Sequence, residues 1–212
     1  DKKFSFFTME KVRKGKGLTE EEEEIISKLP LPDWYIDSLK KIKYMFPKAH
    51  AAAYVMMAFR IAYFKVHHPE AFYATYFTVK ADDFDAQIVC QGYDFVLAEK
   101  QRIEAKGNDI TAKERNTLTV LEVVLEAMVR GIKFIRVDLY RSYIRKFQIP
   151  EEGLLPPLIS LVGLGESAAQ NIAATREEYE FTSIEDLANK ARISKIVIEV
   201  MKEHGVLKGL PE

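Results

Sequence analysis

One segment near the end of the sequence combines two glycines, an apolar residue between them and small residues after them, Gly163-Leu164-Gly165-Glu166-Ser167-Ala168-Ala169. Glycine has no Cβ, so Gly163 and Gly165 can adopt backbone angles closed to other residues and let an anion approach the chain. The backbone N–H groups of Gly163, Gly165 and Ser167 would then point outward at the start of a helix, where the helix dipole favours negative charge. The pattern predicts a phosphate-binding turn between two helices.

The residues around the glycines fit the same interpretation. We expect Leu164 to be buried in the core, and the two alanines to let the two helices pack closely. The whole stretch from Ile159 to Ile172 resembles the helix-hairpin-helix of proteins that bind DNA without sequence preference, with Gly163, Leu164, Gly165, Glu166 and Ser167 at the DNA. Such an element positions the DNA backbone and reads no bases. The alternative is a plain tight turn that uses its glycines for geometry alone.

A second unit follows at residues 193–207, where Ser194 precedes a helical pattern that ends at Gly205. It looks like a degenerate hairpin that lacks the glycine loop. We expect it to pack against the first hairpin.

The charges are unevenly distributed, although the formal net charge is only −1. Between Ser38 and Pro69 there are six Lys or Arg residues, three His residues and no acid, and Lys2–Lys16 adds six basic residues against one acid. Such segregation predicts a positive face on a nearly neutral molecule. The alternative is a pair of solvated helix faces.

The sequence offers no catalytic or metal-ligating cluster. Adjacent histidines such as His67 and His68 point about 100° apart on a helix, and no third ligand lies near them in the sequence. Asp82, Asp83 and Asp85 come nearest to a carboxylate cluster for two-metal chemistry, and we interpret them as a solvated helix start. The single Cys90 has no neighbouring base to activate it, and it excludes an intrachain disulfide, as expected for a cytoplasmic protein.

The composition, with 48% hydrophobic and 30% charged residues among 212, is typical of a soluble globular protein. No apolar run approaches the ~20 residues that a membrane helix needs, so we expect no membrane partner. The sequence has no signal peptide. The missing initial Met and an opening that reads as mid-helix predict that the sequence is a segment of a longer protein.

The fold predicted from the pattern is mainly α. Thr19 with Glu22 and Thr111 with Glu114 form capping boxes. Helical spacing runs from Thr111 to Arg130, and residues 50–66 are apolar nearly all round, which predicts a helix buried on most sides. After Gly131 we expect three short strands, Ile132–Val137, Tyr143–Ile149 and Leu154–Ile159. We therefore place soft boundaries near residues 131 and 158.

Several motifs resemble the α subunit of bacterial DNA polymerase III of the PolC type. The resemblance runs from about Met9 to Leu210, and its first motif is highly specific. The motifs are Tyr44–Tyr54 (YMFPKAHAAAY), Ile61–Pro69 (IAYFKVHHP), Val137–Ser142 (VDLYRS), the glycine hairpin and Phe181–Leu187 (FTSIEDL).

The resemblance implies a division into three parts: a fingers region at 1–130, a short β-containing connector at 131–158 and a helix-hairpin-helix region that binds duplex DNA at 159–212. It also implies that Tyr44, Lys48 and His50 contact the incoming nucleotide. The catalytic carboxylates and their Mg²⁺ would lie in a palm outside this chain, so the chain itself would hold no cofactor and be inactive. The implied partners are primer-template duplex, the deoxynucleotide, the palm and thumb, and a sliding clamp bound through a peptide after Glu212, all in the cytoplasmic replisome.

Three classes of function therefore stand side by side. The first is a segment of a DNA-directed DNA polymerase, a nucleotidyltransferase of DNA replication. The second is a stand-alone, non-catalytic helix-hairpin-helix module that binds DNA. The third is a helical domain whose basic segments dock an acidic protein.

Overall fold

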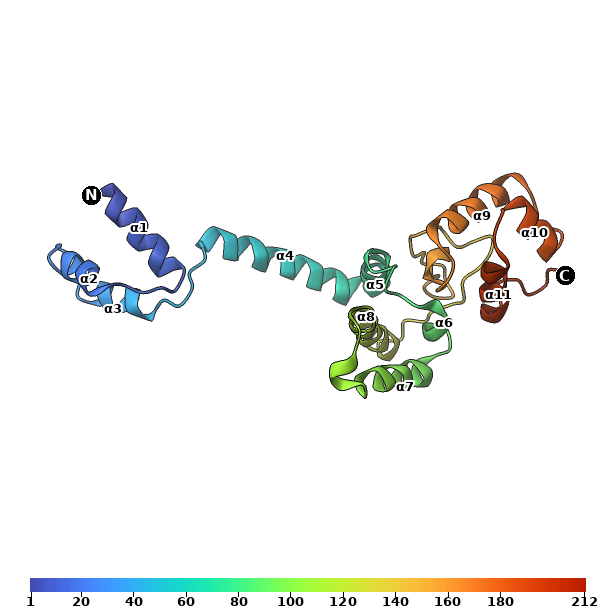
Figure 1. Ribbon diagram of the computed structural model, residues 1–212, viewed down its shortest axis with the longest axis horizontal. Helices are drawn as coiled ribbons and strands as arrows, with labels where there is room; N and C mark the ends of the chain where they lie inside the picture. Colours follow the sequence, from blue (N-terminus) through green and yellow to red (C-terminus); the bar gives the residue numbers. More distant parts are fainter. The chain divides into compact units, whose positions relative to one another are not determined.

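The structure, a computed structural model, describes residues 1–212 and is mainly helical, with no β-sheet. Its helical elements, drawn in Figure 1, are α1 Lys2–Arg13, α2 Glu20–Ser27, α3 Trp34–Lys41, α4 Lys48–His67, α5 Pro69–Val79, α6 Ala86–Val89, α7 Tyr93–Glu104, the 3₁₀ turn η1 Gly107–Asp109, α8 Ala112–Val129, the 3₁₀ turn η2 Leu158–Ser160, α9 Glu166–Glu178, α10 Ile184–Lys190 and α11 Lys195–His204. The chain divides into two compact units, Asp1–Arg60 and Ile61–Glu212.

The first unit contains α1, α2 and α3 (Figure 1). The predicted capping box of α2 is confirmed, because Thr19 Oγ1 accepts from Glu22 N and the Glu22 carboxylate accepts from Thr19 N. Glu22 also forms an ion pair with Lys11 of α1, whose Nζ lies 2.8 Å from Glu22 Oε2. One glutamate therefore both caps α2 and ties it to α1.

Helix α4 departs from its sequence-based prediction. Its apolar residues surround the whole helix, yet none of them is buried, and Phe59 is 73% exposed. The expectation of burial on most sides is therefore wrong for this structure. A helix that is apolar on every side is expected to be covered by other segments. The pattern does not tell which segments cover it.

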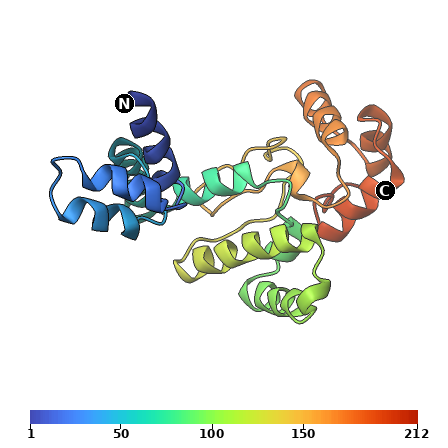
Figure 2. The same cartoon turned by 60° about the vertical axis from the view of Figure 1, so that its left-hand side comes forward.

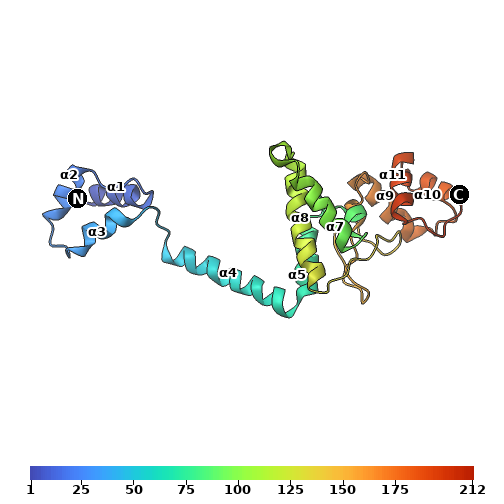
Figure 3. The same ribbon diagram turned by 90° about the horizontal axis from the view of Figure 1, so that it is seen from below.

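In the second unit, α7 and α8 lie side by side (Figures 1 and 3). The predicted capping box at Thr111 and Glu114 begins α8, which ends just before Gly131. The buried face of α8 consists of Val120, Leu121, Val124 and Ala127, which recur at helical spacing. The predicted helix is thus confirmed.

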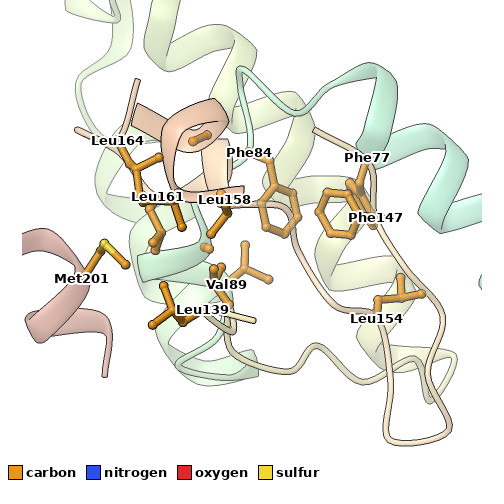
Figure 4. Close-up of a cluster of buried hydrophobic side chains, with 14 of the residues drawn as sticks. Phe77, Phe84, Val89, Leu139, Phe147, Leu154, Leu158, Leu161, Leu164 and Met201 are labelled. Atoms are coloured by element: carbon orange, nitrogen blue, oxygen red, sulfur yellow. The ribbon is translucent and has the colours of Figure 1, made fainter. Parts of the chain in front are cut away.

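One apolar core joins these helices to the C-terminal part of the unit. Phe77, Phe84 and Phe147 lie together in this core (Figure 4). Their rings are in edge-on and tilted contact, with centroids 4.9–5.7 Å apart. Leu158, Leu161 and Leu164 continue the cluster toward Met201 of α11. The hairpin is therefore anchored on the same core as α5 and α8.

The three strands predicted between residues 132 and 159 do not form. The expectation of a β-containing connector at residues 131–158 is therefore wrong. Only two isolated bridges are present, Phe134 with Leu154 and Gln148 with Leu155. Proline at 150, 156 and 157 removes the backbone donors that a longer ladder needs. Side chains replace the ladder, since the buried Ser142 Oγ donates to Pro156 O and accepts from Asp138 N.

Helices α9, α10 and α11 gather at the C-terminal end of the second unit (Figures 1 and 2). None of the helices is both long and apolar enough to cross a membrane. The functional division at residues 131 and 158 stays a prediction, because the compact units are separated elsewhere, between Arg60 and Ile61.

Candidate nucleic-acid interface

The turn between η2 and α9 requires glycine at one of its two glycine positions. Gly163 has φ +103°, which side chains rarely adopt, and a Cβ there would lie 3.1 Å from Val200 Cγ2 of α11. Leu164 N donates to Leu161 O at 2.9 Å, and the Leu164 side chain is only 3% exposed. The predicted burial of Leu164 in the core is confirmed.

Gly165 differs from its prediction. Its φ of −71° and ψ of 162° are open to any residue, and a Cβ at Gly165 would meet no atom within 4 Å. The expectation that both glycines need backbone angles closed to other residues is therefore wrong for Gly165. Neither the backbone nor the packing of this chain requires glycine there, so the open space beside Gly165 is a candidate position for a ligand.

The start of α9 leaves several backbone donors unused. The N–H groups of Gly163, Gly165, Glu166, Ser167 and Ala168 make no hydrogen bond in residues 1–212, and Gly165 provides no side-chain cap. The first turn of any helix lacks internal partners for such donors, and its dipole favours an anion. These amides and the open space at Gly165 lie where the sequence predicts a phosphate site, and the site itself stays a prediction.

A pocket of about 350 Å³ borders this turn and contains charged residues that sequence reasoning missed. It is lined by Val162–Glu166 and, from elsewhere in the chain, by Asp82, Lys113 and Arg145. Arg145 pairs with Asp82 and places Nη1 3.3 Å from Glu166 Oε2. No local pattern could have found these residues, because only the fold brings them to the hairpin.

The second hairpin repeats the backbone of the first. Arg192 has φ +52°, and Ser194 has φ −76° and ψ 160°, close to the angles of Gly165. Ser194 Oγ accepts from Val197 N at 3.4 Å and so caps α11 with a side chain. Val200 of α11 packs against the shared core beside Gly163, which confirms that the second hairpin lies against the first.

The three residues predicted to contact a nucleotide lie in the first unit. Tyr44 and His50 belong to a row of rings in which Phe46 lies 4.7 Å from Tyr44 and stacks on His50 at 5.2 Å, followed by Tyr54 at 4.5 Å from His50. Lys48 begins α4, is exposed and has no ion pair in the 212 residues. Phe46, which precedes α4, and Tyr54, one helical turn after His50, were not singled out from the sequence.

The backbone before Phe46 is held by α1. Met45 N donates to Arg13 O at 3.0 Å. Gly15 has φ +73°, and a Cβ there would lie 1.8 Å from Lys43 O, so only glycine allows this close approach. The end of α1 therefore positions the row of rings.

The predicted positive face is reduced by ion pairs. Lys11 pairs with Glu22, Lys40 pairs with Glu23, and Arg13 and Lys14 both pair with Glu10. Lys41, Lys43, Lys48 and Arg60 make no ion pair in residues 1–212. Lys2, Lys3 and Lys16 of the first basic segment make no ion pair either, so unpaired cations remain in both basic segments and the positive face stays a prediction.

Other titratable groups have structural surroundings. Burial raises the pKa of the Cys90 thiol to about 12, so it is not a nucleophile at neutral pH. Burial also lowers the pKa of His204 to about 4, and its Nε2 accepts a hydrogen bond from Val137 N at 3.2 Å. No group of three or more His, Cys, Asp or Glu side chains in the chain is arranged to hold a metal ion.

Comparison with known proteins identifies the sequence context of these features. Residues 131–212 match the family model of the helix-hairpin-helix motif. The chain is 63% identical over 212 residues to the DNA polymerase III PolC-type of Caldanaerobacter subterraneus subsp. tengcongensis, and it covers 15% of that protein. It is 52% identical over 210 residues, or 99% of the chain, to the DNA polymerase III PolC-type of Clostridium perfringens, covering 14% of it. It is also 55% identical over 208 residues, or 98% of the chain, to that of Bacillus subtilis, again covering 14%.

The chain thus spans about 15% of the length of the curated relatives it matches. Their names and the hairpin match confirm the resemblance predicted from the motifs. Along its whole length, this chain corresponds in sequence to one segment of PolC-type DNA polymerase III, with a helix-hairpin-helix motif at residues 131–212.

Proposed function

We propose that this chain binds duplex primer-template DNA through its first hairpin, as a segment of a DNA-directed DNA polymerase. The observation that carries the proposal is the group of unpaired amides at residues 163–168 beside the open space at Gly165. A phosphate oxygen placed there would accept hydrogen bonds from these amides at a helix N-terminus. The correspondence with PolC along the whole chain favours this reading over a stand-alone module or a protein-docking domain.

Binding of this kind is independent of DNA sequence. Backbone amides contact the phosphate, which every nucleotide carries, and none of the predicted contacts reaches a base edge. A replicative polymerase needs such a contact, because it must hold any duplex that it has just made.

A second role is favoured by the first unit, where Tyr44, Lys48 and His50 would contact an incoming deoxynucleotide. The unpaired Lys48 supplies a cation for a phosphate, and the row of rings with His50 offers a stacking surface for a base. Transfer of a phosphoryl group depends mostly on such positioning and charge stabilisation.

The parent protein would perform template-directed deoxynucleotidyl transfer, with its Mg²⁺ on palm carboxylates outside this chain and a clamp-binding peptide also outside it. The aspartate cluster at residues 82–85 makes structural contacts, since Asp82 pairs with Arg145 and Asp85 accepts hydrogen bonds from Gln87 N and Ile88 N to cap α6. We therefore expect no nucleotide transfer by the 212 residues alone. Primer extension by the purified chain that disappears when Asp82, Asp83 and Asp85 become Asn would contradict this.

The DNA-binding proposal is tested with the 212-residue chain, whose fold is first verified by circular dichroism. Fluorescence anisotropy with two duplexes of equal length and unrelated sequence should give equal affinities that fall linearly on a log–log plot against salt. Preference for one duplex, or no binding at low salt, would contradict it.

A further inference from the structure

The pocket beside the first hairpin carries an arrangement of charges that the helix-hairpin-helix pattern does not contain. Besides the turn itself, its walls include Asp82 after α5, Lys113 in the first turn of α8 and Arg145 before Phe147. These residues are more than 30 positions apart in sequence and meet only at this turn.

Arg145 is placed by two carboxylates. It pairs with Asp82 and with Glu166, the first residue of α9. The side chains of Arg145, Asp82 and Glu166 are 42%, 69% and 56% exposed. Both ion pairs are therefore solvated, and little free energy is needed to break either of them. Arg145 can therefore turn from Glu166 toward a phosphate without leaving a buried charge unpaired.

Lys113 is a cation without a partner. It is exposed and makes no ion pair in residues 1–212, while the next residue, Glu114, pairs with Lys106 and caps the helix. A positive charge in the first turn of a helix opposes the helix dipole. The charge of Lys113 acts on the half-buried Asp85 carboxylate without pairing with it, so Lys113 on the pocket wall is free to pair with an added anion.

We propose that Lys113 and Arg145 supply the positive charge of one phosphate pocket, which is also lined by the turn Val162–Glu166 with its unpaired amides. This rests on the proposed function of the hairpin and extends it to two named side chains. The ligand is a phosphodiester of the duplex backbone. The amides orient it, Lys113 and Arg145 neutralise it, and Asp82 holds Arg145 at the pocket.

The test uses the full-length protein that contains this chain and measures duplex affinity by anisotropy over a series of salt concentrations. Lys113 and Arg145 share one phosphate, so Lys113→Gln combined with Arg145→Gln should lower the steepness of log affinity against log salt by about 0.9, and each single variant should lower it by part of this. Each should also weaken binding about tenfold at low salt, equally for unrelated sequences. Arg102→Gln removes an exposed charge of α7 outside the pocket and should change neither quantity.

A double variant decides whether the cations and the turn act on one phosphate. Gly165→Ala combined with Lys113→Gln should weaken binding by less than the product of the two single effects. A simple product of the two effects would place Lys113 at another phosphate and overturn the proposal.

Two further outcomes are distinguishable. If Gly165→Ala alone weakens binding while Lys113→Gln and Arg145→Gln leave the salt dependence unchanged, the role of the two cations is refuted and the hairpin function stands. If none of the three variants alters binding, both proposals are refuted. Circular dichroism and thermal melting of each variant verify that the fold is retained.

Discussion

The two glycines of the first hairpin should respond differently to alanine, because only one of them is required by the fold. At Gly163 the backbone has φ +103° and the new Cβ would press on Val200 Cγ2 at 3.1 Å. A side chain in such a backbone conformation costs about 1–2 kcal/mol. Gly163→Ala should therefore lower the melting temperature of the chain by about 2–8 °C.

At Gly165 the same substitution meets no strain. The residue has φ −71°, and its Cβ would have no neighbour within 4 Å. Alanine is a poorer N-cap than glycine, which destabilises the fold. Alanine also reduces the conformational entropy of the unfolded chain, which stabilises the fold by about 0.4–1 kcal/mol, so the two effects offset one another. We expect the free energy of unfolding to change by less than about 1 kcal/mol.

DNA affinity should show the opposite order. The Cβ at Gly165 occupies the space of the phosphate, and loss of one hydrogen bond to a charged group costs about 1.5–3 kcal/mol, or roughly tenfold and more in affinity. The assay pairs thermal melting with anisotropy on the same preparations. A Gly165→Ala chain that melts normally and binds duplex as tightly as the parent would refute the role of this turn in phosphate binding.

Three other predictions concern nucleotide use, charge and pH. In the polymerase that contains this segment, Lys48→Ala and His50→Ala should each lower kcat/KM for nucleotide about tenfold or more, with little change in primer-template affinity. Glu166→Gln should tighten duplex binding about two- to fivefold, because its carboxylate lies at the helix N-terminus that receives the phosphate. Burial lowers the pKa of His204 to about 4 from its ordinary 6.5, so the unfolded chain takes up the proton first as pH falls. The corresponding stability is complete above pH 6.5, and about 3 kcal/mol of it should be lost between pH 6.5 and 4.

Each of these predictions has its own control. Unchanged nucleotide kinetics with weaker primer-template binding would reassign Lys48 and His50 to the duplex. Glu178→Gln removes the same charge at the far end of α9 and should leave DNA affinity unchanged. For the histidine, urea unfolding at several pH values is compared with His204→Gln, and equal pH dependence of the two proteins would contradict the assignment.

The sequence predicted best the features that depend on a few neighbouring residues. The capping boxes at Thr19 and Thr111 and the helix before Gly131 are set by contacts within one turn. The hairpin could be predicted for the same reason, because Leu164, its two glycines and the small residues after them lie within seven consecutive positions.

Features that depend on distant partners were missed or wrong. The expected strands before Leu158 have suitable residues, but a strand exists only through a partner ladder, and the prolines of this segment prevent one. Lys113 and Arg145 reach the hairpin only through packing of the whole second unit, so no residue spacing in the sequence predicts that they lie there. The sequence indicated that Gly165 belongs to the hairpin. Only the backbone angles show that the fold does not require glycine at this position.

The amides of the first hairpin offer the most direct test of the account. Amide proton and nitrogen chemical shifts of the ¹⁵N-labelled chain are recorded while unlabelled duplex DNA is added. We predict that the largest shifts fall on Gly163, Gly165, Glu166 and Ser167, with the amide protons moving as they do on hydrogen bonding to an anion. Shifts confined to the acid-free stretch from Ser38 to Pro69, with the hairpin amides unmoved, would contradict it.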